Sequence, residues 1–252
     1  MNDVQAFKVL NLLCNYYKDE EDNLASVDAP SILALGSNEW LIYVFYSCLL
    51  DYGVRSKIYH NNLINTYHEY SFIFNPSYVR DNLKKEELLK IMRENIHPRY
   101  PNVALDKWIN LSSKLAEFDD LKKFVEVMSL EELEAFIKSI GGYGQKTGGL
   151  LIRLIVDAKV IKTSDDLHFI PIDRHDMEIS YLNGIIDKPN LNENDIRLLS
   201  DILISKGHEL GIRASTVDKY LWNVGNFFCN KGKCLDCPLG DHCKKGKRKE
   251  EV

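Results

Sequence analysis

Three short stretches of the chain combine residue types that could bind a phosphate, form a covalent bond or hold a metal. Residues 141–148 read GGYGQKTG, residues 172–175 read IDRH, and cysteines stand at positions 229, 234, 237 and 243. Glycine lets a backbone come close to a ligand, a lysine amine can act as a nucleophile, and four thiolates can hold iron or zinc. The rest of the chain must bring these groups into place.

The glycine-rich stretch predicts a tight turn between two helices. Gly142 and Gly144 can adopt positive φ, and the turn leads into a helix N-terminus, where free backbone N–H groups point outward. Such groups suit a phosphate and position a nucleic acid without reading its sequence. We expect the phosphate contacts to come from Gly142, Gly144, Gln145 and Thr147. A turn that only joins two helices is the alternative.

The elements around these stretches are predicted to be helices, without a convincing sheet. Apolar residues recur at helical spacing, and Ser129 with Glu132 forms a capping box. The first helix is expected to bury Val4, Phe7, Leu10, Leu13, Cys14 and Tyr17. The expected helices span residues 4–18, 38–52, 84–94, 101–115, 120–128, 129–140, 146–157, 173–183, 192–210 and 215–228. The fold class is therefore all-α, with a bundle-like packing of short helices.

The connections between these helices are less regular. An acidic linker is expected over residues 19–28 and a turn over residues 163–166. Residues 54–80 are rich in asparagine and aromatic residues and fit neither periodicity clearly, and residues 54–59 could form a strand or a helix.

Composition and charge describe an ordinary globular chain. Its 252 residues are 45% hydrophobic and 27% charged, enough for a substantial core. The net charge of -5 argues weakly against nucleic acid, but residues 144–162 and 229–252 are each locally basic. Solvated surface charge is the plain alternative. Apolar runs are too short to span a membrane and no signal peptide is evident, so a cytoplasmic location is expected.

Together, the first two motifs resemble those of the helix-hairpin-helix (HhH-GPD) DNA glycosylase superfamily. Its hairpin runs Leu-Pro-Gly-Val-Gly-x-Lys-Thr-Ala, and the matching residues here are Gly142, Gly144, Lys146 and Thr147. A Val-Asp-x-His run follows in the superfamily, and here it is Ile172, Asp173, Arg174 and His175. The resemblance covers roughly residues 38–245 and is closest to the archaeal GO-type 8-oxoguanine DNA glycosylases (AGOG), which share a long connection between hairpin and aspartate.

The resemblance implies a two-lobed helical DNA glycosylase fold with a C-terminal metal-binding loop. Residues 1–252 would form one glycosylase unit. Residues 38–160 would form a barrel-like helical lobe that ends in the helix-hairpin-helix at residues 129–158, and residues 1–37 with 161–228 a second helical lobe. Residues 229–245 would form a metal-binding loop with four cysteine ligands.

Lys146 and Asp173 are the candidate catalytic pair. Breaking a glycosidic bond passes through an oxocarbenium-like state at C1′, which a nearby carboxylate stabilises. A neutral lysine amine can attack that carbon and form a Schiff base, which then permits β-elimination of the 3′ phosphate. Superfamily members that only remove the base lack this lysine, so Lys146 implies a bifunctional enzyme. Alternatively, Lys146 contacts a phosphate, and Asp173 could cap a helix instead of, or besides, acting in catalysis.

A damaged base must leave the duplex to be cut, so the fold needs a pocket. Asp218 and Trp222 are four residues apart on the last predicted helix, where an acceptor and a stacking ring share one face. The AGOG family offers an acid and a tryptophan from the corresponding helix. Arg153, two turns into the Lys146 helix, could reach the same pocket. Core packing is the alternative for Trp222, and His175 is expected to be structural.

Crowding of four cysteines within fifteen residues suggests metal binding in a cytosolic chain. The candidate ligands are Cys229, Cys234, Cys237 and Cys243. Endonuclease III-type glycosylases carry a 4Fe-4S cluster at this position, with the same last two spacings and a longer first one. We therefore expect a 4Fe-4S cluster, with tetrahedral zinc as the alternative.

These implications converge on base excision repair. The expected protein is a DNA glycosylase with AP lyase activity that removes oxidised bases, 8-oxoguanine preferred. Its partner would be double-stranded DNA containing a damaged base. We expect a nucleoid-associated monomer that needs no other protein. The alternatives are an endonuclease III-like enzyme for oxidised pyrimidines and a non-catalytic helix-hairpin-helix DNA-binding protein.

Overall fold

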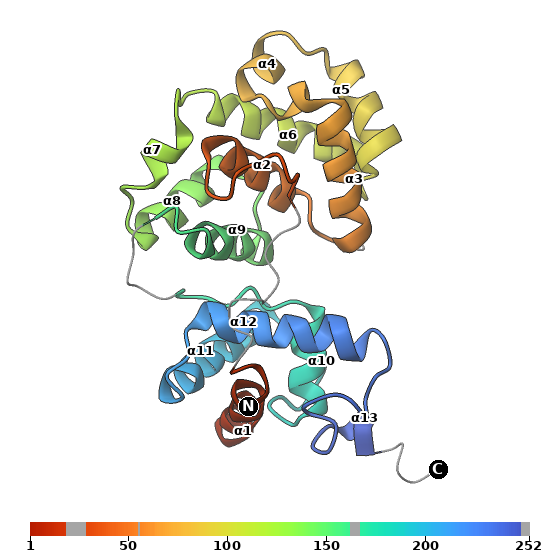
Figure 1. The fold of residues 1–252 in the computed structure, drawn as a ribbon, viewed down its shortest axis with the longest axis vertical. Coiled ribbons are helices and arrows are strands. Elements are labelled where there is room, and N and C mark those ends of the chain that lie inside the picture. Colours follow the sequence, from red (N-terminus) through yellow and green to blue (C-terminus); the bar gives the residue numbers. More distant parts are fainter. Residues whose placement is uncertain (19–28, 55, 162–166, 248–252) are drawn as a thin grey trace. The chain divides into compact units, whose positions relative to one another are not determined.

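The structure is a computed structural model that describes residues 1–18, 29–54, 56–161 and 167–247. These residues form helices and no β-strand, which confirms the all-α class (Figure 1). The linker predicted at residues 19–28 and the turn predicted at 163–166 lie outside them. None of the described helices combines the length and apolar character needed to cross a membrane. The chain divides into two compact units, Ser26–Asp165 and Met1–Ala25 with Asp166–Val252.

The unit Ser26–Asp165, called the hairpin unit below, is built around α2 (Asn38–Leu49). Nine of its twelve residues are buried, so the helix is covered nearly all round. It packs against α6, α7 and α9. The other helices of this unit are α3 (Ser56–Glu69), a 3₁₀ helix (Ser71–Phe74), α4 (Pro76–Asp81), α5 (Lys85–Ile91) with a π-helical turn (Met92–Ile96), α6 (Pro101–Leu115), α7 (Leu121–Val125), α8 (Leu130–Ile140) and α9 (Gln145–Asp157).

Aromatic residues with satisfied polar atoms join α2 to α6. The rings of Tyr46 and Trp108 stack with their centroids 4.3 Å apart. The Tyr46 hydroxyl lies 2.7 Å from Ser112 Oγ, and Trp108 Nε1 donates to the Ile73 carbonyl at 2.9 Å. Because each of these buried polar atoms has a partner, the large rings enter the core without leaving a donor unpaired.

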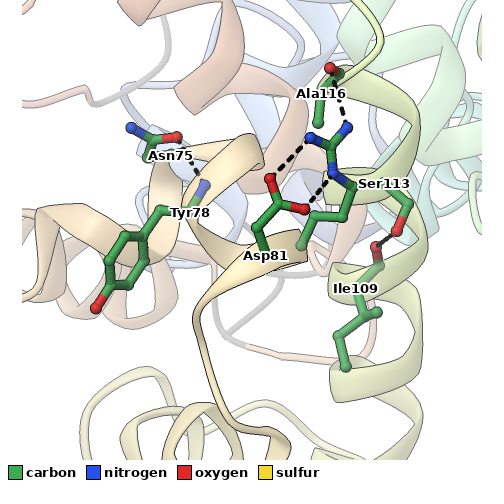
Figure 2. Close-up of polar contacts among 7 residues, drawn as sticks. Asn75, Tyr78, Asp81, Ile109, Ser113 and Ala116 are labelled. Atoms are coloured by element: carbon green, nitrogen blue, oxygen red, sulfur yellow. Dashed lines mark hydrogen bonds and ion pairs between the residues drawn. The ribbon is translucent and has the colours of Figure 1, made fainter.

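Residues 54–80, which the sequence left unassigned, include α3, the 3₁₀ helix and most of α4. Figure 2 shows how α4 begins and how its end meets α6: the Asn75 side chain accepts a hydrogen bond from the Tyr78 backbone N–H at 3.1 Å. Arg80 pairs with Asp81 at 2.7 Å and donates to the Ala116 carbonyl at 3.3 Å, just beyond the end of α6. A capping asparagine followed by Pro76 at the first helical position is a start signal that short helices share with turns.

The second unit, called the terminal unit, contains α1 (Asp3–Tyr17), α10 (Arg174–Leu182), α11 (Glu193–Glu209), α12 (Ala214–Asn223) with a π-helical continuation (Val224–Cys229), and α13 (Lys244–Lys247). Helix α1 packs against α11 and α12 (Figure 1). Its buried residues are Ala6, Val9, Leu10, Leu13 and Tyr17. The prediction that Val4 and Phe7 are buried is wrong, since they are 71% and 37% exposed.

Candidate active site

The predicted hairpin is present between α8 and α9. The capping box that starts α8 is confirmed, because Ser129 Oγ accepts from Glu132 N at 3.2 Å and Glu132 Oε2 accepts from Ser129 N at 2.8 Å. The turn adopts positive φ at Gly141 (77°) and Gly142 (83°). Gly144 does not use the positive φ open to glycine, because this residue is the extended N-cap of α9 with φ −88°.

The turn is held on the body of the hairpin unit by two contacts. The Tyr143 hydroxyl donates to the Phe45 carbonyl of α2 at 2.7 Å, and Lys107 Nζ donates to the Gly142 carbonyl at 2.9 Å. A Cβ on Gly142 would stand 3.2 Å from Leu49 Cδ1. Both the positive φ and the limited space at this position therefore favour glycine. Around Gly144, a Cβ would meet nothing within 4 Å. The backbone that leads into α9 is therefore open to a ligand.

The first turn of α9 offers backbone N–H groups, as predicted, because the opening residues of a helix have no intrahelical acceptor. The side chain of Thr147 is buried, and its Oγ1 accepts from the Gly144 N–H at 3.0 Å. A phosphate contact from Thr147 would therefore use its backbone. Gln145 and Gly144 are exposed at the same end of the helix.

Lys146 is the second residue of α9 and is partly exposed. Its Nζ donates to the backbone carbonyl of Asp51 at 3.4 Å. Asp51 follows α2 and is only 4% exposed, and its carboxylate accepts from Ser56 Oγ at 3.0 Å. Asp51 was not among the candidate site residues predicted from the sequence, because it belongs to none of the motifs. An acid placed directly after an apolar helix and before Gly53 was the available signal.

Asp51 remains a carboxylate because of its neighbours. Burial alone raises the pKa of its carboxyl, but nearby His60, the charge of Lys146 and the Ser56 hydroxyl outweigh this effect and hold the pKa below its ordinary value. His60 Nε2 lies 3.8 Å from Asp51 Oδ2. The hairpin unit thus buries a negative charge beside the lysine.

Arg153 lies on the same helix as Lys146 and is 7% exposed. Burial and Asp51 raise the pKa of the Cys48 thiol, while Arg153 and Lys146 act on it in the opposite direction. The charges of Arg153 and Lys146 therefore both act on the Cys48 thiol. Its contact with a base remains a prediction.

In the terminal unit, Asp173 occupies the N-cap of α10. Its Oδ1 accepts from the backbone N–H of His175 at 2.6 Å and of Asp176 at 3.1 Å. The capping role considered from the sequence is confirmed, and it does not exclude a catalytic one. Asp173 and Lys146 belong to different units, so their pairing remains a prediction.

The two base-pocket candidates on α12 differ in exposure. Asp218 is buried, and its charge contributes to raising the pKa of the Asp176 carboxyl. Trp222 is partly exposed and meets Phe227 edge-on with ring centroids 6.2 Å apart. His175 lies against Gly225, where a Cβ would stand 2.8 Å from the His175 Cβ, and its structural role remains a prediction.

The four C-terminal cysteines lie in a compact loop and are all partly exposed. The Cys229 thiol has its pKa raised to about 11 by burial and by Cys237 and Cys243. A Cβ on Gly240 would stand 2.5 Å from the Cys234 carbonyl, so glycine lets the loop close on itself. The donor set suits iron or zinc, but the described residues contain no group of three or more histidine, cysteine or acidic side chains disposed to hold a metal. The metal loop therefore remains a prediction.

No family profile matches the sequence, and no curated protein does. Solved structures of DNA glycosylases share the fold of this chain. The 8-oxoguanine glycosylase/lyase of Methanocaldococcus jannaschii, solved with a 15mer DNA containing 8-oxoguanine, is 21% identical with a TM-score of 0.59, and the match covers 86% of this chain and 95% of that one.

Two further structures are similar to this chain. The 8-oxoguanine DNA glycosylase of Thermotoga maritima has 18% identity and a TM-score of 0.58, over 88% of this chain and 97% of its own. A trapped covalent endonuclease III–DNA intermediate has 15% identity and a TM-score of 0.65, over 99% of both chains. The fold expected from the motifs is thus confirmed.

Proposed function

We propose that this protein is a bifunctional DNA glycosylase/AP lyase that removes oxidised bases, with 8-oxoguanine preferred. The observation that carries the proposal is the position of Lys146, on the first turn of α9 directly after a glycine hairpin and partly exposed. The start of a helix offers backbone N–H groups that suit a phosphate. The position of Lys146 therefore places its amine close to where a DNA backbone would bind.

The hairpin would hold the DNA backbone on the strand that carries the lesion. The open backbone at Gly144, exposed Gln145 and the α9 N-terminus would contact phosphate without reading sequence. The similar glycosylase/lyase of Methanocaldococcus jannaschii was solved with lesion DNA, which supports a DNA partner here.

The chemistry would proceed at C1′ of the damaged nucleotide. The neutral Lys146 amine attacks C1′ while the bond to the base breaks, and the base leaves with the bonding electrons and takes up a proton. The Asp173 carboxylate stabilises the positive charge that develops on the sugar. Ring opening gives a Schiff base between Nζ and C1′, and loss of a C2′ proton then expels the 3′ phosphate.

The extruded base would be received by groups on α12 and α9. Asp218 can accept a hydrogen bond from a base N–H, the Trp222 ring can stack on its face, and Arg153 can supply a donor. The preference for 8-oxoguanine is supported by the likeness to two 8-oxoguanine glycosylases.

The cysteines at positions 229, 234, 237 and 243 would hold a 4Fe-4S cluster, or zinc, as a structural group. When bound, the metal would fix the loop that carries Lys231, Lys233, Lys244 and Lys245, and these lysines could contact the DNA backbone. No step of the reaction depends on it.

Borohydride trapping tests the proposal. Wild-type protein mixed with an 8-oxoguanine duplex and borohydride should form a covalent protein–DNA adduct, and Lys146→Gln should form none. Lys138→Gln, which removes an exposed lysine from α8 of the same hairpin, is the matched control and should trap normally. A wild type that traps nothing and nicks nothing on any lesion leaves a non-catalytic DNA-binding protein as the surviving alternative.

A second candidate is an enzyme for oxidised pyrimidines. The likeness to endonuclease III and the C-terminal cysteines favour it. A panel of duplexes decides between the two, because a thymine glycol substrate cut faster than 8-oxoguanine would transfer the assignment to the pyrimidine enzyme.

A further inference from the structure

Lys107 on α6 meets the hairpin turn across a separation of 35 residues in the sequence. Its Nζ donates to the Gly142 carbonyl at 2.9 Å and lies 4.4 Å from the centroid of the Tyr52 ring. The stem of the lysine also lies along the turn, because a Cβ on Gly142 would stand 3.5 Å from Lys107 Cγ. The ammonium group is therefore held in one place beside the hairpin.

No carboxylate in the described part of the chain forms an ion pair with Lys107. The Asp51 carboxylate, from the segment that follows α2, is instead engaged by Ser56 and His60 of α3. A helix brings residues three and four positions away to the same face, and acidic residues there often pair with a lysine. Around Lys107 these positions hold no acid, since they are occupied by Val103, Ala104, Asn110 and Leu111.

The ammonium group of Lys107 is also partly removed from water. Its side chain is only partly exposed, and burial lowers its pKa. A lysine that gives up part of its hydration is usually compensated by a carboxylate. Here a neutral carbonyl and an aromatic ring are the recorded contacts of Nζ. An anionic ligand would supply the counter-charge that the described residues do not.

The place of Lys107 indicates which anion this ligand carries. The lysine contacts Gly142, two residues before the open backbone at Gly144 that leads into α9 and suits a phosphate. Arg99 adds a second positive charge near Tyr52, because a Cβ on Gly53 would stand 2.6 Å from Arg99 Nη1. Phosphates recur about every 3.4 Å of helix axis along one DNA strand, so a strand held at the α9 N-terminus brings further phosphates to the same edge of the hairpin unit.

We propose that Lys107 is a DNA-backbone-binding residue, whose ammonium group neutralises a phosphate neighbouring the one bound by the hairpin. The inference rests on the proposed function, which brings DNA to the hairpin, and adds a charged contact to the uncharged N–H groups of the turn. Lysine acts on a phosphate as a point charge and reads no base. The contact is therefore made with undamaged duplex as well as with lesion DNA.

The salt dependence of binding to undamaged duplex, measured by fluorescence anisotropy, tests this role. In Lys107→Gln, affinity at low salt should fall by about tenfold through the lost charge-assisted contact. The slope of log K against log salt concentration should become shallower by about 0.9, the counterion contribution of one neutralised phosphate. Lys107→Arg retains the positive charge and should keep the wild-type slope.

Lys114→Gln is the matched control. It removes the same charge from the same helix, at a lysine whose Nζ lies 3.6 Å from Glu117 Oε1. Its slope should equal that of wild type. An equal loss of slope in Lys114→Gln would reduce the effect to net charge and overturn the inference.

A fall in affinity with an unchanged slope in Lys107→Gln would also overturn it, because the lysine would then only support the turn through Gly142. If Lys107→Gln does not fold in a thermal melt, acetylation of the wild type with acetic anhydride decides the matter by mass spectrometry. Undamaged duplex should protect Lys107 and leave Lys114 reactive, and equal modification of Lys107 with and without duplex contradicts the proposal.

The proposed function fails in a different way. A wild type that forms no borohydride adduct contradicts the lyase assignment, while the salt slope on undamaged duplex still decides the role of Lys107. A wild type that traps normally but whose slope is unaffected by Lys107→Gln overturns this inference alone.

Discussion

Asp173 and Asp176 hold each other by reciprocal hydrogen bonds at the start of α10. Asp173 Oδ1 accepts from the Asp176 backbone N–H at 3.1 Å, and Asp176 Oδ2 accepts from the Asp173 backbone N–H at 2.7 Å. Asp176 is 2% exposed, and burial together with the charges of Asp173 and Asp218 raises its pKa well above the ordinary value. Folding therefore favours the protonated form of Asp176 relative to an exposed aspartate.

Asp176→Asn should become increasingly stabilising relative to wild type as the pH rises. The unfolded carboxyl loses its proton near its ordinary pKa of about 3.9, while the folded one keeps it, so the wild type loses stability as the pH rises above that value. Asparagine has no proton to lose and can still accept from the Asp173 N–H. We expect its Tm to gain about 2–4 °C on wild type between acid and neutral pH, the shift that about 1 kcal/mol produces in a chain of this size.

Asp187→Asn is the control, since it removes an exposed carboxyl from the same unit and should show a pH-independent difference from wild type. A Tm difference for Asp176→Asn that stays constant across the pH series, or shrinks as the pH rises, would contradict the raised pKa of Asp176.

Many helix starts could be predicted from the sequence because an N-cap or capping box involves residues no more than four apart in the chain. The helices expected from residues 120 and 192 begin there, with Asp120 and Asn192 as their N-caps, and Ser129 with Glu132 forms the predicted box. The first helix shows where local reasoning ends. Periodicity alone allowed a face with Val4 and Phe7, but the surfaces of α11 and α12 bury Ala6 and Val9 instead. Helix α12 begins at Ala214, one residue ahead of the expected start at residue 215, with Arg213 at its N-cap position.

The candidate site divides in the same way. The sequence placed Lys146 at the start of α9 and Asp173 at the N-cap of α10, because both follow from motifs a few residues long. Asp51 and His60 could not be found in this manner, since their contacts with Lys146 and Ser47 depend on how α2, α3 and α9 pack. The role of Asp176 was hidden for a related reason: a carboxylate in the first turn is an ordinary helix residue until its burial is known.

Asp173→Asn should separate catalysis from capping. Asparagine is as good an N-cap as aspartate, so the helix should keep its start and the Tm should change little. The variant lacks the negative charge, and we expect single-turnover base release to fall by about 10²–10³-fold, as when one electrostatic contact to a transition state is removed. Asp173→Ala should lose about 1 kcal/mol of stability in addition, through the lost cap.

Release of the base by Asp173→Asn at the wild-type rate would leave Asp173 as a structural cap only. The unfolding curves of both variants show whether a slow enzyme is also a poorly folded one, which keeps the two effects apart.

The three glycines of the hairpin should respond differently to alanine. Gly141, with φ 77° and ψ 167°, and Gly142, with φ 83°, have backbones that alanine rarely adopts, so each variant should lose about 1–3 kcal/mol of stability. Gly144 has φ −88° and open space for a Cβ, so Gly144→Ala should keep its Tm. Its affinity for DNA should nevertheless fall by about tenfold, because the methyl group stands between the backbone and the phosphate. Fluorescence anisotropy with undamaged duplex measures this loss, and unchanged affinity in Gly144→Ala would remove this turn from the DNA interface.

The C-terminal loop predicts the colour and the metal content of the purified protein. Four thiolates that hold a 4Fe-4S cluster should give a brown preparation with absorbance near about 400 nm, whereas zinc gives a colourless one. Cys237→Ser should lose the metal, because it leaves three thiolates, and the Tm should fall since metal binding is coupled to folding of the loop. Cys14→Ser, in α1, is the matched control and should retain the full metal content. Elemental analysis of anaerobically purified wild type identifies the metal: iron supports the 4Fe-4S cluster, and stoichiometric zinc supports the zinc site instead. A preparation free of both metals contradicts a metal-binding loop. The close packing of Gly240 against the Cys234 carbonyl would then be what holds residues 229–243 together.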